Sequence, residues 1–500
     1  MGIDVGTGGT RALLVNEAGT VVAAESAAHQ DIAMPQPLWA QQDAEDWWGA
    51  AQRAIRAARR AAGDHALRGI GLTGQMHGVV LLDINDRVLG PSLIWCDQRT
   101  QPQVDELTQQ IGAQRIIELT GNPMLTGFSA PKLLWERRHR AAEFTQARHF
   151  LLPKDYIRLK LTGEFATDVA DASGTGLFDV GGRNWSKPML DALGLPAAFV
   201  PRAYEGPEIT GSVSGLGAEA TGLPMGIPVV AGGGDQAAGA VGNGIVRAGI
   251  ASATIGTSGV VFAATDQPLV DRQGRIHTFC HSVPGMWHVM GVTQGAGLSL
   301  RWVRDQLGTV ENEAAGKRHA DPYELLCELA ATIAAGSDGL LFLPYLMGER
   351  TPHLDALARG GWIGLTASHT RAHLVRSVLE GVAYSLRDSF EIFRELGLRS
   401  SEVRLSGGGA RGRTWPRIQT DVYGVQCARM TSLEGAAYGA ALLAMVGSGR
   451  FPSVVAACDH CLREADRMMP DAAAAAVYNR DYAVYRELYP RLQTLFPQMC

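Results

Sequence analysis

The chain has 500 residues, of which 46% are hydrophobic and 19% charged, as in ordinary folded globular proteins. The net charge of −5 is small for this length, and no long run of like charges occurs, which argues against binding to nucleic acid or to an anionic membrane. No apolar stretch is long enough to span a bilayer, and the N-terminus lacks the apolar segment of a signal peptide. The length indicates two or three domains.

Cysteines are scattered along the chain, at positions 96, 280, 327, 427, 458, 461 and 500. An odd number without framework spacing predicts reduced thiols and a cytoplasmic protein. Cys458 and Cys461 have CxxC spacing, but no second ligand pair follows them. We therefore interpret this run as part of a helix rather than as a zinc site.

Apolar periodicity and turn residues predict alternating strands and helices, beginning with a β-meander. Strands are expected at 2–5, 10–15, 20–24, 70–73, 79–82, 88–94, 227–231, 339–346 and 403–405. Helices are expected at 43–62, through most of 101–161, and at 236–242, 372–396 and 436–445. The first helix opens at Asp43, a residue typical of an N-cap.

The opening hairpin occurs a second time half a chain later. Asp4-Val5-Gly6-Thr7-Gly8-Gly9-Thr10-Arg11 aligns with Thr254-Ile255-Gly256-Thr257-Ser258-Gly259-Val260-Val261. A repeat at this distance predicts two similar domains rather than a solenoid. With the boundary placed near Val246, the domains are 1–246 and 247–500, and each presents a Gly-rich hairpin toward a shared cleft.

Gly-rich tips with hydroxyl side chains offer backbone N–H groups and hydroxyls to phosphate oxygens. Gly6 and Thr7 stand at the first tip, and Gly256, Thr257 and Ser258 at the second. A plain hairpin turn explains either tip alone equally well, and the repetition favours phosphate binding. Neither a Walker A nor a GxGxxG motif occurs in the chain, which argues against P-loop and Rossmann nucleotide binding.

Two carboxylates stand beside glycine-rich strand ends. Asp4 precedes the first hairpin and would hold Mg²⁺ through water, because Mg²⁺ keeps several of its waters in proteins. Asp235 follows Gly232-Gly233-Gly234 at a strand-to-helix switch, where glycines permit close approach of a substrate. A carboxylate there can serve as the base that phosphoryl transfer needs. An Asp at this position is also typical of an N-cap, and the two roles are compatible.

Two further strand ends carry polar or glycine-rich runs. Gln75-Met76-His77-Gly78 could hydrogen-bond sugar hydroxyls, although by itself it is more simply a capped turn. Gly407-Gly408-Gly409-Ala410-Arg411 would let a flat base lie against the backbone, or is again a turn.

Taken in order, these elements resemble the FGGY family of carbohydrate kinases over essentially the whole chain. Phe128-Ser129-Ala130-Pro131-Lys132-Leu133-Leu134-Trp135 is similar to the first family signature, and the region from Gly361 to Glu380 is similar to the second. The family belongs to the actin-like ATPases. The resemblance therefore implies an α/β fold of two actin-like, ribonuclease H-like domains, each a mixed sheet flanked by helices, with the active site in the cleft between them.

The resemblance also implies a reaction. Runs at 74–78, 94–99, 152–156 and 348–353 are similar to those of family members that phosphorylate D-xylulose. This implies ATP- and Mg²⁺-dependent transfer to O5, giving D-xylulose 5-phosphate and ADP. Asp235 would be the general base and Asp4 would belong to the magnesium–phosphate cluster.

The same resemblance implies which residues bind each substrate. The ketose would be contacted by Gln75, Met76, His77, Trp95 and Asp235. The nucleotide would be bound by Gly6, Thr7, Thr10, Arg11, Gly256, Thr257, Ser258, Gly407, Gly408, Gly409 and Arg411, with Gly435 and Ala436 also lining the adenosine pocket. A homodimer is typical of the family.

The chain departs from the family pattern in its slightly short first strand and at three residues, Gly8, Arg11 and Gln236, where Ser, Lys and Asn are usual. None of these departures removes a key charge. Two alternatives stay open. One is another substrate, such as L-xylulose, ribulose, glycerol or gluconate. The other is a non-catalytic actin-like ATPase that binds a protein partner, although such a protein has no need of Asp235 or of a Met76–His77 loop.

Overall fold

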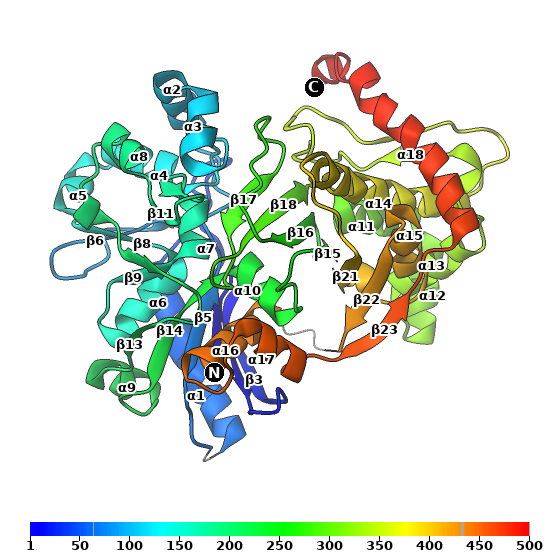
Figure 1. The fold of residues 1–500 in the computed structure, drawn as a ribbon. Helices are drawn as coiled ribbons and strands as arrows, with labels where there is room; N and C mark the ends of the chain where they lie inside the picture. Colours follow the sequence, from blue (N-terminus) through cyan, green and yellow to red (C-terminus); the bar gives the residue numbers. More distant parts are fainter. Residues whose placement is uncertain (64, 432–434, 500) are drawn as a thin grey trace.

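The computed structural model describes residues 1–63, 65–431 and 435–499, and two mixed β-sheets organise them. The first sheet contains, in spatial order, β13 (Ile209–Ser212), β14 (Pro228–Gly234), β5 (Ile70–Gly74), β1 (Gly2–Val5), β2 (Gly9–Val15) and β3 (Val21–Ala28). The second contains β17 (His277–Cys280), β18 (Trp287–Thr293), β16 (Gly259–Thr265), β15 (Ile250–Ile255), β21 (Glu402–Gly407), β22 (Gln426–Met430) and β23 (Glu464–Met468). Figure 1 shows the two sheets side by side with helices around each, which confirms the expected pair of α/β domains.

The two sheets repeat one topology. In each, an antiparallel hairpin (β1–β2 or β15–β16) continues into a third antiparallel strand (β3 or β18). The first strand of each hairpin also pairs in parallel with a later strand, β5 or β21. The predicted repeat is therefore confirmed in the strands. The tips differ, because Val5 pairs with Thr10 whereas Ile255 pairs with Gly259, so the second hairpin closes one residue earlier.

Helices cover both faces of the first sheet because its strands alternate their side chains between two cores. On one face, α1 (Ala44–Ala62) packs Trp47 and Ile55 into a core with Leu14. The expected cap is confirmed, since the Asp43 carboxylate accepts a hydrogen bond from the backbone N–H of Glu45 at 2.9 Å. The opposite face carries Leu13, which belongs to a separate core.

That second core is filled by helices from the far end of the chain. α16 (Gly435–Gly447) and α17 (Val454–Cys461), orange in Figure 1, lie against the first sheet. A side chain at Gly2 would overlap the carbonyl of Ala437 in α16, so the helix and the strand touch backbone to backbone. The hydroxyl of Tyr438 donates to the carbonyl of Gly19 at 2.6 Å. These two helices follow position 246 in sequence but pack on the N-terminal sheet, and the boundary at 246 stays a prediction.

The second sheet has its own large core. α14 (Arg371–Glu395) is its longest helix, and α11 (Ala296–Leu307), α15 (Thr414–Tyr423) and α18 (Ala472–Leu492) pack around it. Within residues 1–63, 65–431 and 435–499, no helix has the length and apolar character needed to cross a membrane. The six described cysteines are free thiols, and Cys500 lies outside the described residues.

The remaining predicted elements agree in type but several are shorter. The region 101–161 is mostly helical. It forms α2 (Gln101–Ile111), α3 (Ala113–Thr120), α4 (Ser129–His139), α5 (Ala141–Gln146) and α6 (Pro153–Thr162), with β8 (His149–Leu151) between α5 and α6. The strands expected at 79–82, 88–94 and 339–346 are β6 (Val80–Leu82), β7 (Ser92–Leu93) and β19 (Leu341–Leu343). Cys458 and Cys461 lie in α17, so their interpretation as helical residues is confirmed.

Candidate active site

The predicted catalytic residues meet at one edge of the first sheet. β14, β5 and β1 are parallel neighbours, with Gly234 opposite Gly74 and Gly74 opposite Val5. Their carboxyl ends therefore stop at the same level, the edge at which open α/β sheets bind ligands. A cavity of about 260 Å³ opens there, lined by Asp235 from this sheet and by Thr254 from the second. The edge thus faces a cleft between the two sheets.

Asp235 is the first residue of α10 (Asp235–Gly242), and its side chain does not cap the helix. The N-cap position belongs to Gly234, so the carboxylate is left to face the cleft. The amide of Gln236 donates to it at 3.4 Å. Burial, together with the nearby charge of Asp4, raises the pKa of Asp235 to about 7. A carboxyl with that pKa can take up a proton at neutral pH.

The three glycines before Asp235 serve protein packing, and their expected role in the approach of a substrate stays a prediction. β14 bulges between Val230 and Gly233 relative to β5, and Gly232 has a φ of 77°. A side chain at Gly233 would overlap Ser282, and one at Gly234 would overlap Met76. The glycines let β14 bend and let Ser282 and Met76 pack directly on the strand.

Asp4 is the second acid of this edge. Its Oδ1 is buried and has no hydrogen-bond partner within the described structure. Burial raises the pKa of Asp4 to about 6, and the charge of Arg11 opposes the shift. An unpartnered carboxylate oxygen near a second acid fits a cation. Among the described residues no cluster of three or more His, Cys, Asp or Glu could hold a metal alone. Asp4 therefore suits an ion held mainly by water and phosphate, as Mg²⁺ is.

The first hairpin is hydrogen-bonded through Thr7 to Gln75 and Trp95, two of the residues predicted to contact the sugar. Its hydroxyl donates to Gln75 Oε1 at 3.2 Å and accepts from Trp95 Nε1 at 3.0 Å. The Gln75 amide nitrogen donates to Gln42 Oε1 at 2.9 Å, and Gln42 in turn donates to the Thr7 carbonyl at 2.8 Å. Thr10, also buried, bonds His29 at 2.9 Å. Gln75 is 1% exposed with both ends of its amide bonded to protein, so it positions the loop, whereas the Trp95 ring is 48% exposed.

His77 has a strained backbone and a defined tautomer. Its φ is +69°, a conformation that non-glycine residues rarely adopt outside functional positions. Its Nδ1 lies 2.6 Å from the carbonyl of Gly174 and must donate to it, so Nε2 is an acceptor. Burial and the charge of Lys132 lower the pKa of His77 to about 3, which keeps the ring neutral.

The first family signature holds this loop in place. Ser129 Oγ and Lys132 Nζ both donate to the carbonyl of His77, at 3.2 and 3.0 Å. Phe128 packs on the His77 ring, with centroids 5.2 Å apart, and joins Met76 in an apolar cluster. Met76 is almost fully buried. The signature therefore fixes both the backbone and the imidazole of the strained residue.

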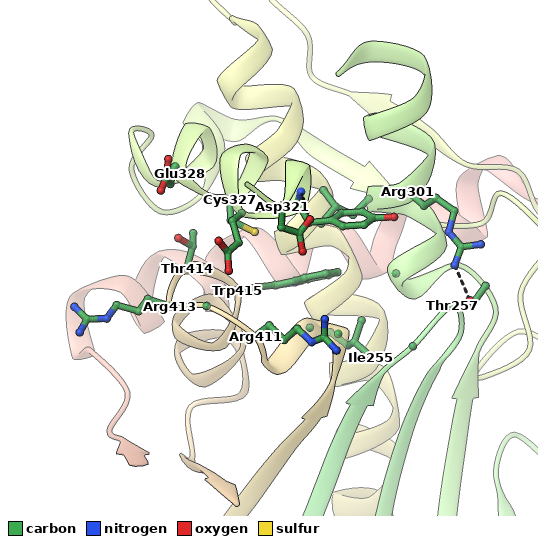
Figure 2. Close-up of a pocket in the computed structure, with 18 residues that line it drawn as sticks. Ile255, Thr257, Arg301, Asp321, Cys327, Glu328, Arg411, Arg413, Thr414 and Trp415 are labelled. Atoms are coloured by element: carbon green, nitrogen blue, oxygen red, sulfur yellow. Dashed lines mark hydrogen bonds between the residues drawn. The ribbon is translucent and has the colours of Figure 1, made fainter. Parts of the chain in front are cut away.

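A larger pocket of about 560 Å³ lies at the edge of the second sheet (Figure 2). The predicted residues that line it are Gly256, Thr257, Gly408, Gly409 and Arg411. Figure 2 shows Trp415 and Arg411 on one side and Asp321 and Cys327 on the other, with Arg301 donating to Thr257. That hydrogen bond, from Nη2 to Oγ1, is 3.1 Å. The pocket is apolar between two polar ends, which suits a nucleoside with phosphates near Thr257.

Some predicted nucleotide residues lie elsewhere. Ser258 does not line this pocket, and Gly407 and Gly435 line the smaller cavity with Asp235 instead. Gly407 has a φ of 73°, and a side chain on Gly409 would overlap Ile255, so both glycines let the chain turn closely around the end of β15, the parallel neighbour of β21. The lining residues that the sequence motifs missed are Gly297, Leu300, Arg301, Asp321, Tyr323, Glu324, Cys327, Glu328, Gly412, Arg413, Thr414 and Trp415. Most of them belong to α11, α13 (Pro322–Ala331) and α15, or cap the start of α13 or α15.

Comparisons with known proteins agree along the whole chain. Models of the FGGY family of carbohydrate kinases match residues 1–242 (N-terminal domain) and 251–448 (C-terminal domain). The xylulose kinase of Escherichia coli K12 is 41% identical over 99% of both chains. The gluconokinase of Bacillus subtilis is 29% identical over 100% of this chain and 97% of its own. The crystal structure of xylulose kinase from Rhodospirillum rubrum, 32% identical, covers 99% of both chains with a TM-score of 0.92.

Proposed function

The chain belongs to the FGGY family of carbohydrate kinases, and on that premise we propose that it transfers a phosphoryl group from ATP to O5 of D-xylulose. Kinases of this family use ATP. The identity to the Escherichia coli xylulose kinase exceeds that to the Bacillus subtilis gluconokinase, and this difference favours xylulose as the acceptor. The products are D-xylulose 5-phosphate and ADP.

The observation that carries the proposal is the pair of acids at the sheet edge. Asp235 faces the cleft with a pKa of about 7, so a large fraction is ionised at neutral pH. Its carboxylate accepts the proton of the O5 hydroxyl as that oxygen attacks the γ-phosphorus, and the bond to the leaving ADP oxygen breaks. Asp4, with its unpartnered Oδ1, would hold Mg²⁺. When bound, the ion neutralises charge on the phosphate oxygens.

The sugar is positioned by residues of the first sheet. His77 Nε2 accepts a hydrogen bond from a sugar hydroxyl, because Nδ1 is committed to Gly174. The exposed Trp95 ring offers an apolar face beside Thr7. These fixed contacts reduce the freedom of the attacking hydroxyl, which is the main contribution a protein makes to phosphoryl transfer.

The nucleotide is bound mainly by the second sheet. Its base and ribose would occupy the pocket beside Trp415 and Arg411, and its phosphates would approach Thr257 and Arg301. The tip at Thr7 completes the phosphate site from the other side of the cleft. Because the two hairpins belong to different sheets, we propose that the sheets approach each other when both substrates are bound, which excludes water from the transfer.

Two further expectations remain part of this proposal. A homodimer follows from the family resemblance and is tested by sedimentation equilibrium. A cytoplasmic location agrees with the free thiols of the six described cysteines.

The test is ADP release with ATP and Mg²⁺ across D-xylulose, L-xylulose, D-ribulose, L-ribulose, glycerol and D-gluconate. D-xylulose is expected to give the highest kcat/KM, and ³¹P–¹H coupling in the product should place the phosphate on C5. A higher kcat/KM with another sugar would keep the kinase and overturn the xylulose assignment. ATP binding without sugar-dependent ADP release would favour the non-catalytic ATPase.

A further inference from the structure

The sugar end of the site offers hydrogen-bond acceptors but few available donors. His77 Nε2 and the Asp235 carboxylate both accept. The indole N–H of Trp95 is directed at Thr7 Oγ1, and the amide nitrogen of Gln75 at Gln42. A ketose, however, contains one oxygen that can only accept, its C2 carbonyl. A site that recognises a ketose therefore needs a donor that these residues do not supply.

Arg350 lies next to the wall of this site and comes from the other half of the chain. Its neighbour Thr351 is bonded twice to Val292 of β18: Thr351 N donates to the Val292 carbonyl at 2.9 Å, and Val292 N donates to Thr351 Oγ1 at 3.1 Å. Val292 packs against the apolar cluster that contains Met76 and Phe128. The backbone at Arg350 is thus anchored beside the residues that surround His77.

The guanidinium of Arg350 is partly buried, yet no hydrogen bond or ion pair engages it anywhere in residues 1–63, 65–431 and 435–499. The adjacent acid, Glu349, is already occupied, since its carboxylate accepts from Gln294 N at 2.8 Å and from Ser385 Oγ at 3.3 Å. The positive charge of Arg350 contributes to the low pKa of both His77 and His277, which means that it lies close to both rings.

A partly buried guanidinium without an acceptor is unfavourable in a protein that binds nothing there. Its charge and its five N–H groups suit an oxygen that only accepts. Asp271 and Glu395, by contrast, pair with Arg275, so the acids of this region have partners of their own. A sugar bound beside His77 can therefore also reach Arg350, which lies close to that ring.

We propose that Arg350 donates a hydrogen bond to the C2 carbonyl of the ketose and so selects ketoses over the corresponding polyols. The inference rests on the proposed function and adds that the site recognises the C2 carbonyl of the substrate. The three groups around the sugar then have different roles. Asp235 takes the proton from O5, His77 accepts a hydrogen bond from a hydroxyl, and Arg350 donates a hydrogen bond to the carbonyl. Because Arg350 is anchored to the second sheet, the bound ketose also links the two halves of the cleft.

The test compares D-xylulose with xylitol and D-arabinitol, the two pentitols formed when its carbonyl is reduced. Wild-type protein should prefer D-xylulose. Arg350→Gln should lower kcat/KM for D-xylulose by about 10- to 100-fold and change the pentitol values by less than about 3-fold. Where a pentitol is turned over too slowly to measure, its inhibition constant in the phosphorylation of D-xylulose is compared instead of kcat/KM. Arg399→Gln, at an exposed arginine of the same half, is the matched control and should leave every value unchanged.

Folding and nucleotide binding are checked separately. ADP affinity and the unfolding temperature of Arg350→Gln should match the wild type, because Arg350 does not line the nucleotide pocket. Arg350→Lys keeps the charge and a single donor group, so its kcat/KM for D-xylulose should lie between the values of the wild type and of Arg350→Gln. If the Gln variant does not fold, the Lys variant is compared with the wild type instead.

Two outcomes separate this inference from the proposed function. A wild type that prefers D-xylulose, with an Arg350→Gln variant that weakens ketose and pentitols equally or not at all, overturns the inference and leaves the proposed function standing. A wild type that prefers glycerol, which has no carbonyl, overturns both. A preference for another ketose overturns only the D-xylulose assignment, and the same comparison is then made with that ketose and its polyols.

Discussion

Asp4 and Asp235 lie at the carboxyl ends of two parallel strands, close enough that the charge of Asp4 adds to the effect of burial in raising the pKa of Asp235 to about 7. Burial is the larger cause of the shift. The relationship connects the residue suited to a cation with the residue suited to a proton. A cation near Asp4 would remove the repulsion and make Asp235 a carboxylate over a wider range of pH.

The first prediction concerns the pH dependence of catalysis. Because the base must be ionised, and because bound Mg²⁺ would offset the charge of Asp4, kcat/KM for the sugar should rise between pH 5 and pH 8 with an apparent pKa no higher than about 7. Steady-state rates across this range provide the measurement. Without Mg²⁺, where nothing offsets the charge of Asp4, Asp4→Asn should lower the pKa of Asp235 itself, which an NMR titration of ¹³C-labelled aspartate carboxyls measures. An unchanged or higher pKa of Asp235 in Asp4→Asn would show that the two acids are not coupled.

The second prediction concerns stability. The carboxyl of Asp235 has an ordinary pKa of 3.8 and a folded-state pKa of about 7, so the folded state binds its proton more tightly than the unfolded state. The contribution of this group to the free energy of unfolding is fully present below pH 4 and is lost as the pH rises to 7. Asp235→Asn avoids that loss. At pH 8 it should unfold with a free energy about 1–2 kcal/mol higher than the wild type, after discounting for partial exposure.

Denaturant unfolding at pH 4, 6 and 8 measures this difference. The two proteins should coincide at the lowest pH and separate as the pH rises. A difference that is largest at pH 4 would contradict the raised pKa of Asp235. Asp191→Asn, at an acid exposed on the surface and paired with exposed Lys187, is the control and should show no stabilisation at pH 8.

The third prediction concerns the support of the sugar loop. Ser129→Ala removes one of the two donors to the carbonyl of His77 and leaves Lys132 in place. A lost hydrogen bond of about 0.5–1.5 kcal/mol corresponds to a rise of about 2- to 10-fold in KM for the sugar. KM for ATP should stay the same, because no residue of the 75–78 loop lines the pocket of the second sheet that is proposed to bind the nucleotide. Equal changes in both constants would indicate a general loss of folding instead.

Local sequence patterns predicted where most strands lie, that the hairpin repeats, and that Asp4 and Asp235 stand at strand ends. The hairpin at Asp4 and the switch at Asp235 depend on residues next to each other in sequence, where glycine, turn and capping rules apply. The packing of α16 on the first sheet could not be predicted in this way. It depends on the close fit of Gly2 against Ala437, two residues at opposite ends of the chain.

The roles of single side chains were harder to predict for the same reason. Gln75 stands in a polar strand end typical of ligand contact, yet its amide is occupied by Thr7 and Gln42, which no local pattern links to it. Arg301 and Arg350 stand outside the glycine-rich runs. Only the fold brings Arg301 to the pocket of the second sheet and bonds Thr351, the neighbour of Arg350, to Val292 of β18. The glycines before Asp235 also allow a bulge and tight packing, which depend on Ser282 and Met76, residues distant in sequence that no local pattern links to them.

The most direct test of the central claim is sugar-dependent ADP release by Asp235→Ala beside the wild type, with ATP, Mg²⁺ and D-xylulose. The variant should fold, bind ADP with unchanged affinity, and lose kcat by at least about 100-fold, because the base that takes the O5 proton is gone. Gln236→Asn, a change at the adjacent residue that leaves the carboxylate in place, should keep most of the activity. Turnover by Asp235→Ala within a few-fold of the wild type would contradict the account.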